Sequence, residues 1–316
     1  MISIMRHWFR KVVQDAALCS GASAWRARSQ HARRILTLHG VGAQDMPLER
    51  FTTLMRWLRR YARVVPLEGM LASLRAGEPA GPELEVALTF DDGLANQFLL
   101  AYPVLRELGL SATIFACPQL IDEGRWLWTH EARARWRRLS PDSRRELADE
   151  FAMPDQDTQS VVGWLKSLPS QTREHIFARV REATPDFRPE RSESMAYDLM
   201  TWEQIRRMDP TCVTIGSHTL SHPILTTLGD QDLERELRDS RSLLETRLDR
   251  AVPTLCYPNG SVDARVRDCA ARHYEAAMST CEAFIPEGPV DYWFMPRIAL
   301  SSELALSVWR LHSPQS

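Results

Sequence analysis

Short apolar runs alternate along this chain with longer stretches whose apolar residues recur at helical spacing. Seven of the short runs are rich in β-branched residues and have the length of strands: 35–38, 62–65, 86–90, 112–117, 213–216, 254–257 and 276–279. The helical spacing occurs between them, at residues 48–60, 96–108, 202–208, 231–248 and 264–273. Such alternation predicts parallel strands joined by crossover helices. About seven strands favour an α/β fold with a closed or nearly closed β/α barrel, although periodicity alone does not separate a barrel from an open sheet.

Two parts of the chain depart from this rhythm. Residues 124–196 are rich in Arg, Glu, Trp and Ser, follow a helical pattern and lack a strand-like run. We interpret them as a helical insertion in one connection, placed to cover the mouth of an active site. Residues 1–34 precede the first strand as an N-terminal arm or amphipathic helix. The predicted organisation is therefore an arm at 1–34 and a catalytic barrel at 35–316 that contains the insertion.

The arm has basic flanks and a weak apolar centre that polar residues interrupt. A secretory signal needs a cleaner apolar run, and no run of roughly 18 or more apolar residues is present for a spanning helix. The plainer interpretation is a surface helix. The alternative is a basic amphipathic helix that rests on a membrane, with Trp8, Phe9 and Val12 toward the lipid.

Charge and cysteine usage narrow the class of protein. The formal net charge is -2 at pH 7, whereas a nucleic-acid-binding protein is usually strongly basic, so we expect no nucleic-acid partner. Six cysteines are scattered without a Cys-x-x-Cys pair, and several lie in strand-like runs. This favours a reducing compartment, although an even number leaves disulfides open. We therefore expect a cytoplasmic protein, peripheral at the inner membrane in the alternative interpretation of the arm.

Two adjacent carboxylates follow the third strand-like run. Residues 86–90 predict a buried strand, and Asp91, Asp92 and Gly93 end it. Alone, Asp-Asp-Gly is ordinary turn chemistry, because Asp tolerates turn geometry and Gly supplies positive φ. Catalytic groups of β/α barrels, however, gather at the C-terminal ends of strands. The position of this pair therefore favours function over a simple turn.

Two histidines follow another strand-like run. In zincins a His-x-x-x-His pair lies on a helix with Glu after the first His, but Thr219 follows His218 here, and Pro223 disfavours a helix through His222. The pair is therefore predicted on a loop at a strand end. Histidines with ordinary hydrogen bonds remain an alternative for this segment alone.

Taken together, the two segments predict a metal-dependent hydrolase. One aspartate and two histidines make a facial set that holds a divalent metal and leaves positions open for water and substrate. The remaining aspartate is then free to act as a base.

The segments Thr89-Phe-Asp-Asp-Gly93 and His218-Thr-Leu-Ser-His222 resemble the first two motifs of the polysaccharide deacetylases, carbohydrate esterase family four. Supporting stretches lie at residues 35–41, 112–116, 255–260 and 295–299. The resemblance extends from about residue 35 to residue 309, with four motifs in the family order. It implies a distorted β/α barrel and a hydrolase of non-peptide carbon–nitrogen bonds that removes acetyl groups from N-acetylhexosamine units.

The resemblance also implies a role for each matching residue. The metal would be Zn²⁺, with Co²⁺, Mn²⁺ and Ni²⁺ as alternatives, and its ligands would be Asp92, His218 and His222. Asp91 would be the general base, and Arg297 would keep it ionised and oriented. The backbone N–H of Asn259, at a position where the family usually has tyrosine, would stabilise the oxyanion.

The chain departs from the family pattern at two positions. The family often takes its general acid from a Leu-x-His motif near the C-terminus, whereas the tail here reads Trp309-Arg-Leu-His312. His312 is either this acid or the end of a last helix, which the spacing favours, and His39, at a strand end, is a second candidate. The arginine common in the third motif is Cys256 here, which leaves more of the orienting role to Arg297.

Several aromatic side chains could stack on a sugar ring, although core packing is the more common role for any one of them: Tyr257, Trp126, Trp128, Trp202 and Trp293. Trp126 and Trp128, at the start of the insertion, are the better placed. We expect a bacterial enzyme whose partner is an N-acetylated glycan or a lipid-linked saccharide. A hydrolase of a non-sugar amide and a non-catalytic glycan-binding relative remain alternatives.

Overall fold

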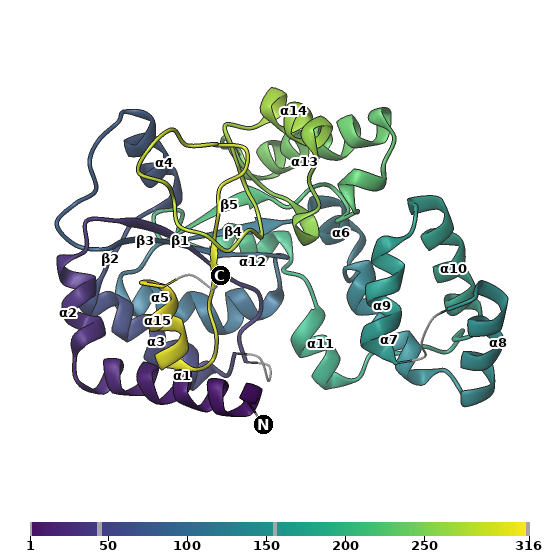
Figure 1. Cartoon of the computed structure of the whole chain (residues 1–316). Helices are drawn as coiled ribbons and strands as arrows, with labels where there is room; N and C mark the ends of the chain where they lie inside the picture. The colour runs from purple at the N-terminus through teal and green to yellow at the C-terminus, as the bar shows by residue number, and fades with distance from the viewer. Residues whose placement is uncertain (1, 43–45, 154–156, 314–316) are drawn as a thin grey trace.

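The computed structural model describes residues 2–42, 46–153 and 157–313, with side chains from residue 8 onward. Parallel strands form one sheet in this part of the chain (Figure 1). Their bounds are β1 Arg33–Leu38, β2 Arg63–Val64, β3 Glu85–Phe90, β4 Ala112–Ala116, β5 Val213–Ser217, β6 Thr254–Cys256, β7 Ala276–Met278 and β8 Ile298–Ala299. The seven predicted strands are confirmed. The short strand β8 was not predicted, because it is only two residues long and follows Pro296 and Arg297.

The sheet curls into a distorted barrel. Its strand order is β7-β6-β5-β4-β3-β1-β8, with β2 paired to β3. Met295 forms a parallel bridge with Met278 of β7, and three residues later Ile298 pairs with Leu36 of β1. The segment 295–299 therefore joins the two ends of the curled sheet and confirms the barrel-type fold. It also carries Arg297 to the rim of the barrel.

Helices cover the outside of the sheet at the predicted positions. The five predicted helical stretches correspond to α3 (Leu48–Tyr61), the π-helical η1 (Gln97–Ala101) continued by α5 (Tyr102–Leu108), α12 (Trp202–Arg207), α13 (Asp230–Leu248) and α14 (Ala264–His273). Further short helices are α4 (Leu67–Arg75), α6 (Pro118–Glu123), η2 (Leu225–Thr227), η3 (Pro258–Gly260) and α15 (Leu304–Arg310). Every residue of β1, β3 and β4 is buried, as expected for parallel strands covered on both faces.

The insertion forms a helical lobe beside the barrel (Figure 1). Its helices are α7 (Trp128–Arg138), α8 (Pro141–Phe151), α9 (Thr158–Ser167), α10 (Ser170–Glu182) and α11 (Arg191–Tyr197). Trp136, Phe177 and Val162 belong to an apolar cluster that these helices share. The chain then returns to the barrel at Leu199, which bridges Leu94 just after the Asp-Asp-Gly sequence. The lobe is therefore anchored next to the candidate site.

The N-terminal arm consists of two helices, α1 (Ile2–Cys19) and α2 (Ala22–Ser29). Helix α1 packs against α15 and α2, and Lys11 pairs with Glu303 at 3.3 Å. Trp8, Phe9 and Val12 are 65%, 64% and 43% exposed, so apolar side chains of α1 face solvent. Among the described residues, no helix combines the length and apolar character needed to cross a bilayer.

Candidate active site

Polar side chains from five strand ends line one cavity of about 190 Å³. Each follows the C-terminal end of its strand, the edge at which β/α barrels carry catalytic groups. From the barrel they are His39 after β1, Asp91 and Asp92 after β3, His218 and His222 after β5, Tyr257 and Asn259 after β6, and Thr280 after β7. The insertion completes the wall with Leu127, Thr129, His130, Arg133 and Lys166. The structure thus brings both sequence motifs into a single cavity.

Asp92, His218 and His222 converge within this cavity. The Oδ1 atom of Asp92 lies 3.5 Å from Nε2 of His218 and 3.7 Å from Nε2 of His222. One ligand atom from each of the three residues lies within 4.8 Å of the other two, and all three side chains are buried. The set is therefore arranged around one point.

The donor set fits a divalent metal such as zinc. Tetrahedral ligands at about 2 Å from a zinc ion lie about 3.3 Å apart, close to the separations that the structure shows. Nδ1 of His218 bonds to the carbonyl oxygen of Cys256 at 2.8 Å, which orients the ring and leaves Nε2 for a metal. Among the described residues, Nδ1 of His222 has no hydrogen-bond partner.

A second group of ligand types lies beside the first. Asp91, His218 and Cys256 also bring one ligand atom each within 4.8 Å of the others. Both carboxylate oxygens of Asp91 are, however, already bonded to Arg297. A metal there would have to replace that ion pair, so the set of Asp92 with the two histidines is the better metal site.

Asp91 and Arg297 form a buried two-point ion pair. Nη1 of Arg297 donates to Oδ1 of Asp91 at 2.7 Å, and Nη2 donates to Oδ2 at 2.8 Å. The guanidinium is fixed in turn by Ser279, whose carbonyl oxygen accepts from Nε at 2.9 Å, and by the Thr89 hydroxyl at 3.1 Å. Burial would raise the pKa of the Asp91 carboxyl, but the Arg297 charge lowers it to about 2. Asp91 is therefore held ionised.

Cys256 occupies the space beside this pair. Its Sγ atom lies 3.1 Å from Nη2 of Arg297 and 3.5 Å from Oδ1 of Asp91. Burial raises the pKa of the Cys256 thiol, so the side chain is neutral and adds no second positive charge. Arg297 thus supplies the positive charge that contacts Asp91.

Positive φ angles place the metal-site residues on tight turns. Asp92 has φ 76° and Gly93 φ 69°. A Cβ atom on Gly93 would lie 3.2 Å from Cα of Ala116, so this position favours glycine on both grounds. Thr219 has φ 66° and His222 has φ 60°. Such a conformation is uncommon for any residue other than glycine and is most unusual for the β-branched Thr219. Non-glycine residues in this region store strain that the surrounding structure must hold, a pattern found at functional sites.

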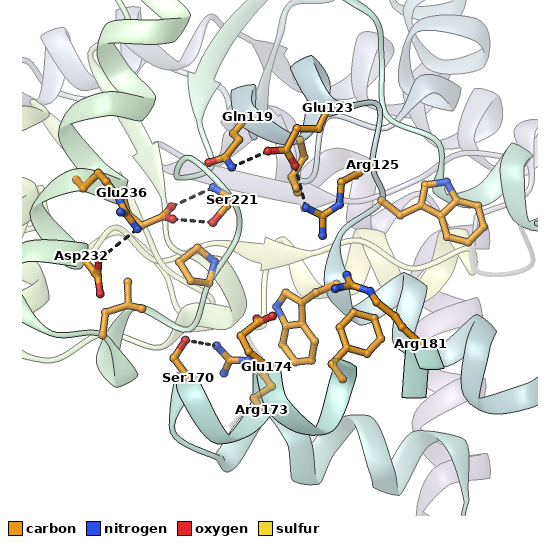
Figure 2. Close-up of a pocket in the computed structure, with 17 residues that line it drawn as sticks. Gln119, Glu123, Arg125, Ser170, Arg173, Glu174, Arg181, Ser221, Asp232 and Glu236 are labelled. Carbon is orange, nitrogen blue, oxygen red and sulfur yellow. Dashed lines mark hydrogen bonds and ion pairs between the residues drawn. The ribbon is translucent and has the colours of Figure 1, made fainter. Parts of the chain in front are cut away.

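Glu236 on α13 holds the loop between the two histidines. Its carboxylate accepts hydrogen bonds from the backbone N–H groups of Leu220 and Ser221 at 2.9 and 3.0 Å. The Ser221 hydroxyl adds a third at 2.6 Å (Figure 2). Glu236 is 5% exposed, and burial raises its pKa. This carboxylate is a positioning group for the strained loop, and no sequence motif had pointed to it.

A second cavity, of about 270 Å³, lies behind the same loop and against the insertion (Figure 2). Trp128 lines it together with Arg173, whose guanidinium lies 4.9 Å from the centre of the Trp128 ring. Nε1 of Trp128 donates to the carbonyl oxygen of His222 at 3.2 Å. Trp128 is therefore buried at the contact between insertion and barrel and lines this second cavity, and its role as a sugar platform stays a prediction. Trp126 is likewise buried and bonds to Asp198.

His312 lies away from the cavity. Nδ1 of His312 bonds to the side chain of Gln30 at 2.7 Å, and the ring is buried beneath the N-terminal arm. Gln30 precedes β1, so His312 lies near the start of that strand, whereas His39 follows its opposite end. This placement disfavours His312 as the general acid. The alternative, a residue at the end of the last helix, describes its position.

The other predicted site residues line the catalytic cavity. Tyr257 lines the cavity and is fully buried, and its hydroxyl donates to the carbonyl oxygen of Trp293 at 2.9 Å. Asn259 has φ 55°, in the tight turn η3. His39 follows β1 and lies on the same wall.

The insertion residues on the cavity wall were missed by sequence reasoning. Thr129, His130 and Arg133 lie on α7 and Lys166 lies on α9. No strand-end pattern marks them, because they come from helices that only the tertiary fold places over the strand ends. The one indication in the sequence that they could reach the site was that the insertion lies in the connection between β4 and β5.

Comparison with known proteins agrees with this geometry. The family model described as polysaccharide deacetylase matches residues 79–275, more than half of the chain. A Bacillus subtilis protein, YxkH, whose name assigns it to the polysaccharide deacetylases, is 33% identical over 112 residues. That match covers 34% of this chain and 39% of the relative, so the chain aligns with well under half of that protein.

Two solved structures share the fold. The Streptococcus pyogenes deacetylase PplD, in complex with acetate, superposes with a TM-score of 0.60 at 17% identity, over 89% of this chain and 96% of that one. IcaB from Ammonifex degensii superposes with a TM-score of 0.60 at 15% identity, over 90% of this chain and 98% of that one. At these identities the structures establish the barrel and its connections.

Proposed function

Because this chain belongs to the polysaccharide deacetylase family, we propose that it removes acetyl groups from N-acetylhexosamine units of a polysaccharide or glycan precursor and releases acetate. The observation that carries the proposal is the convergence of Asp92, His218 and His222 beside the ion pair of Asp91 with Arg297. A metal set next to a fixed, ionised base is an arrangement that can activate water for the hydrolysis of an amide.

Asp92, His218 and His222 would hold the metal, with zinc as the proposed ion. When bound, such an ion supplies Lewis acidity, which polarises the acetamide carbonyl and lowers the pKa of water. Asp91 accepts the proton of the attacking water, since Arg297 keeps the carboxylate ionised and its oxygens fixed.

The turn that follows β6 provides a hydrogen-bond donor for the oxyanion that develops during the reaction. Asn259 lines the cavity in a conformation with φ 55°, and we assign its backbone N–H as a donor to the tetrahedral intermediate. Tyr257 fixes this turn by its bond to Trp293. The donor then needs no reorganisation during the reaction.

The departing amine needs a proton, and two cavity histidines lie outside the metal set. Burial lowers the pKa of His130 to about 4, so this ring is neutral near pH 7 and cannot donate. We therefore assign the general acid to His39, which follows β1 on the same wall. His39→Gln is expected to slow acetate release far more than His130→Gln.

The proposal is tested by acetate release from a panel of N-acetylated glycans by the zinc-loaded protein. Asp91→Asn is expected to abolish turnover while it retains the metal. Asp149→Asn, an exposed position on α8, is the matched control and keeps wild-type turnover. Full activity of Asp91→Asn would exclude Asp91 as the base. Hydrolysis of only non-sugar amides would favour the alternative substrate class.

A further inference from the structure

Two cations of the insertion face the candidate catalytic cavity, and neither has an anionic partner among the described residues. Arg133 of α7 and Lys166 of α9 both line it, and both are half-buried. The other half-buried arginines of α7 are paired: Arg135 with Glu131 at 2.8 Å and Arg138 with Glu193 at 2.6 Å. Within the described part of the chain, no carboxylate bonds or pairs with either Arg133 or Lys166.

The carboxylates of the cavity do not balance these charges. Only Asp91 and Asp92 among its lining residues are acidic. Asp91 is neutralised by its two-point ion pair with Arg297, and Asp92 belongs to the metal set. Burial and the Arg133 charge together lower the pKa of Lys166, and the Asp92 charge offsets this lowering only in part. The two cations are therefore close enough to repel each other. Half-buried like charges without a partner are costly, and an anion bound between them would offset that cost.

We propose that the substrate carries an anionic group, a phosphate or a carboxylate, next to the sugar that bears the acetamide, and that Arg133 and Lys166 bind it. This inference rests on the proposed function, because it assigns the acidic group to the same substrate. A guanidinium offers two parallel donors to such a group, and an ammonium adds a mobile point charge. The insertion is then a specificity element, and a neutral glycan is a poorer ligand.

The test is a binding comparison in zinc-loaded protein that carries Asp91→Asn, so that no ligand is consumed. One pair of ligands is N-acetylglucosamine 1-phosphate and the neutral methyl glycoside of N-acetylglucosamine. A second pair is a hyaluronan tetrasaccharide, which carries carboxylates, and neutral chitotetraose. In one of the two pairs, the acidic ligand is expected to bind at least about tenfold more tightly than its neutral partner. A preference in the first pair identifies the group as a phosphate, and a preference in the second identifies it as a carboxylate.

The preference is expected to disappear when Arg133→Ala is combined with Lys166→Met. Arg137→Ala removes an exposed charge from the same helix and is expected to leave the preference intact. Metal content is measured in each variant, because a phosphate that contacts only the metal would keep its advantage in the double variant. Three results would each overturn the inference. The acidic ligand could keep its advantage in the double variant, acidic and neutral ligands could bind equally tightly, or the acidic ligands could show no detectable binding. If the protein with Asp91 intact releases acetate from none of the glycans, the proposed function is overturned instead. The two failures are distinguishable, because binding is measured without turnover.

Discussion

The carboxylate of Asp91 and the guanidinium of Arg297 meet in a two-point ion pair, at 2.7 and 2.8 Å, across 206 positions of the sequence. Arg297 reaches this position because the segment 295–299 closes the barrel between β7 and β1. The base of the proposed reaction is thus oriented by the part of the chain that completes the fold.

Arg297→Lys should separate orientation from charge. A lysine keeps the positive charge but cannot bond both oxygens of Asp91 in one plane. We expect kcat for acetate release to fall roughly 100-fold, because a misplacement of about 1 Å can have that effect. Metal content should be unchanged, since Arg297 does not contact the metal set. Steady-state kinetics with metal analysis checks both, and wild-type kcat in the lysine variant would contradict the role of the pair.

Glu236→Gln should weaken metal binding although Glu236 is not one of the proposed metal ligands. Glutamine keeps the size of the side chain but loses the charge that three hydrogen bonds from the loop stabilise. Loss of such outer partners typically costs about 10–100-fold in metal affinity. Competition with a chelating dye measures the change in zinc affinity.

The matched control for that experiment is Glu245→Gln on the same helix. Glu245 accepts hydrogen bonds from the Arg241 side chain and from the backbone N–H of Val252, near the C-terminal end of α13 and away from the histidine loop. Its zinc affinity should equal that of the wild type. Equal losses in both variants would mean that α13 is generally destabilised and that Glu236 has no specific role.

Glu131→Gln should destabilise the protein in a pH-dependent way. Burial would raise the pKa of Glu131, but Arg181 and Arg135 lower it below its usual 4.5. The ionised form therefore contributes stability that is fully present above pH 4.5 and is lost as the pH falls through the folded-state pKa. At pH 7 we expect a loss of about 1–3 kcal/mol in the free energy of unfolding. Urea unfolding from pH 7 to about pH 3 should show the difference from wild type shrinking below pH 4.5, and a constant difference down to about pH 3 would contradict this account.

Helix α1 presents Trp8 and Phe9 to solvent, 65% and 64% exposed. An exposed apolar face with basic neighbours is typical of a helix that rests on a membrane surface. We expect the protein to sediment with vesicles of anionic phospholipid, and the double substitution Trp8→Ser with Phe9→Ser to reduce the bound fraction severalfold. Equal sedimentation of both proteins would exclude this face as the contact.

The sequence was sufficient to predict seven of the strands and to place the Asp91-Asp92 and His218–His222 segments at strand ends, and the reason is physical. Parallel strands are buried on both faces, so their apolar runs stand out, and a residue such as His218 is placed by the strand that it follows. Arg297 could be assigned only from the family resemblance, because no local pattern reveals a partner 206 positions away.

The remaining features depend on packing between distant elements. The sequence could not place the side chains of His312 and Trp128, because an aromatic residue or a histidine near a motif carries no information on which cavity it faces. Glu236, Arg133 and Lys166 lie on helices whose sequences read as ordinary amphipathic surfaces. Only the docking of α13 and of the insertion onto the strand ends gives these three side chains a role.

The central claim is that a metal held by Asp92, His218 and His222 is required for deacetylation. It is tested most directly by acetate release from an N-acetylated glycan before chelation, after chelation, and after zinc is added back. Turnover is expected to vanish with the chelator and to return with zinc in the wild type, whereas His222→Ala should stay inactive throughout. Undiminished acetate release from metal-free protein would contradict the account.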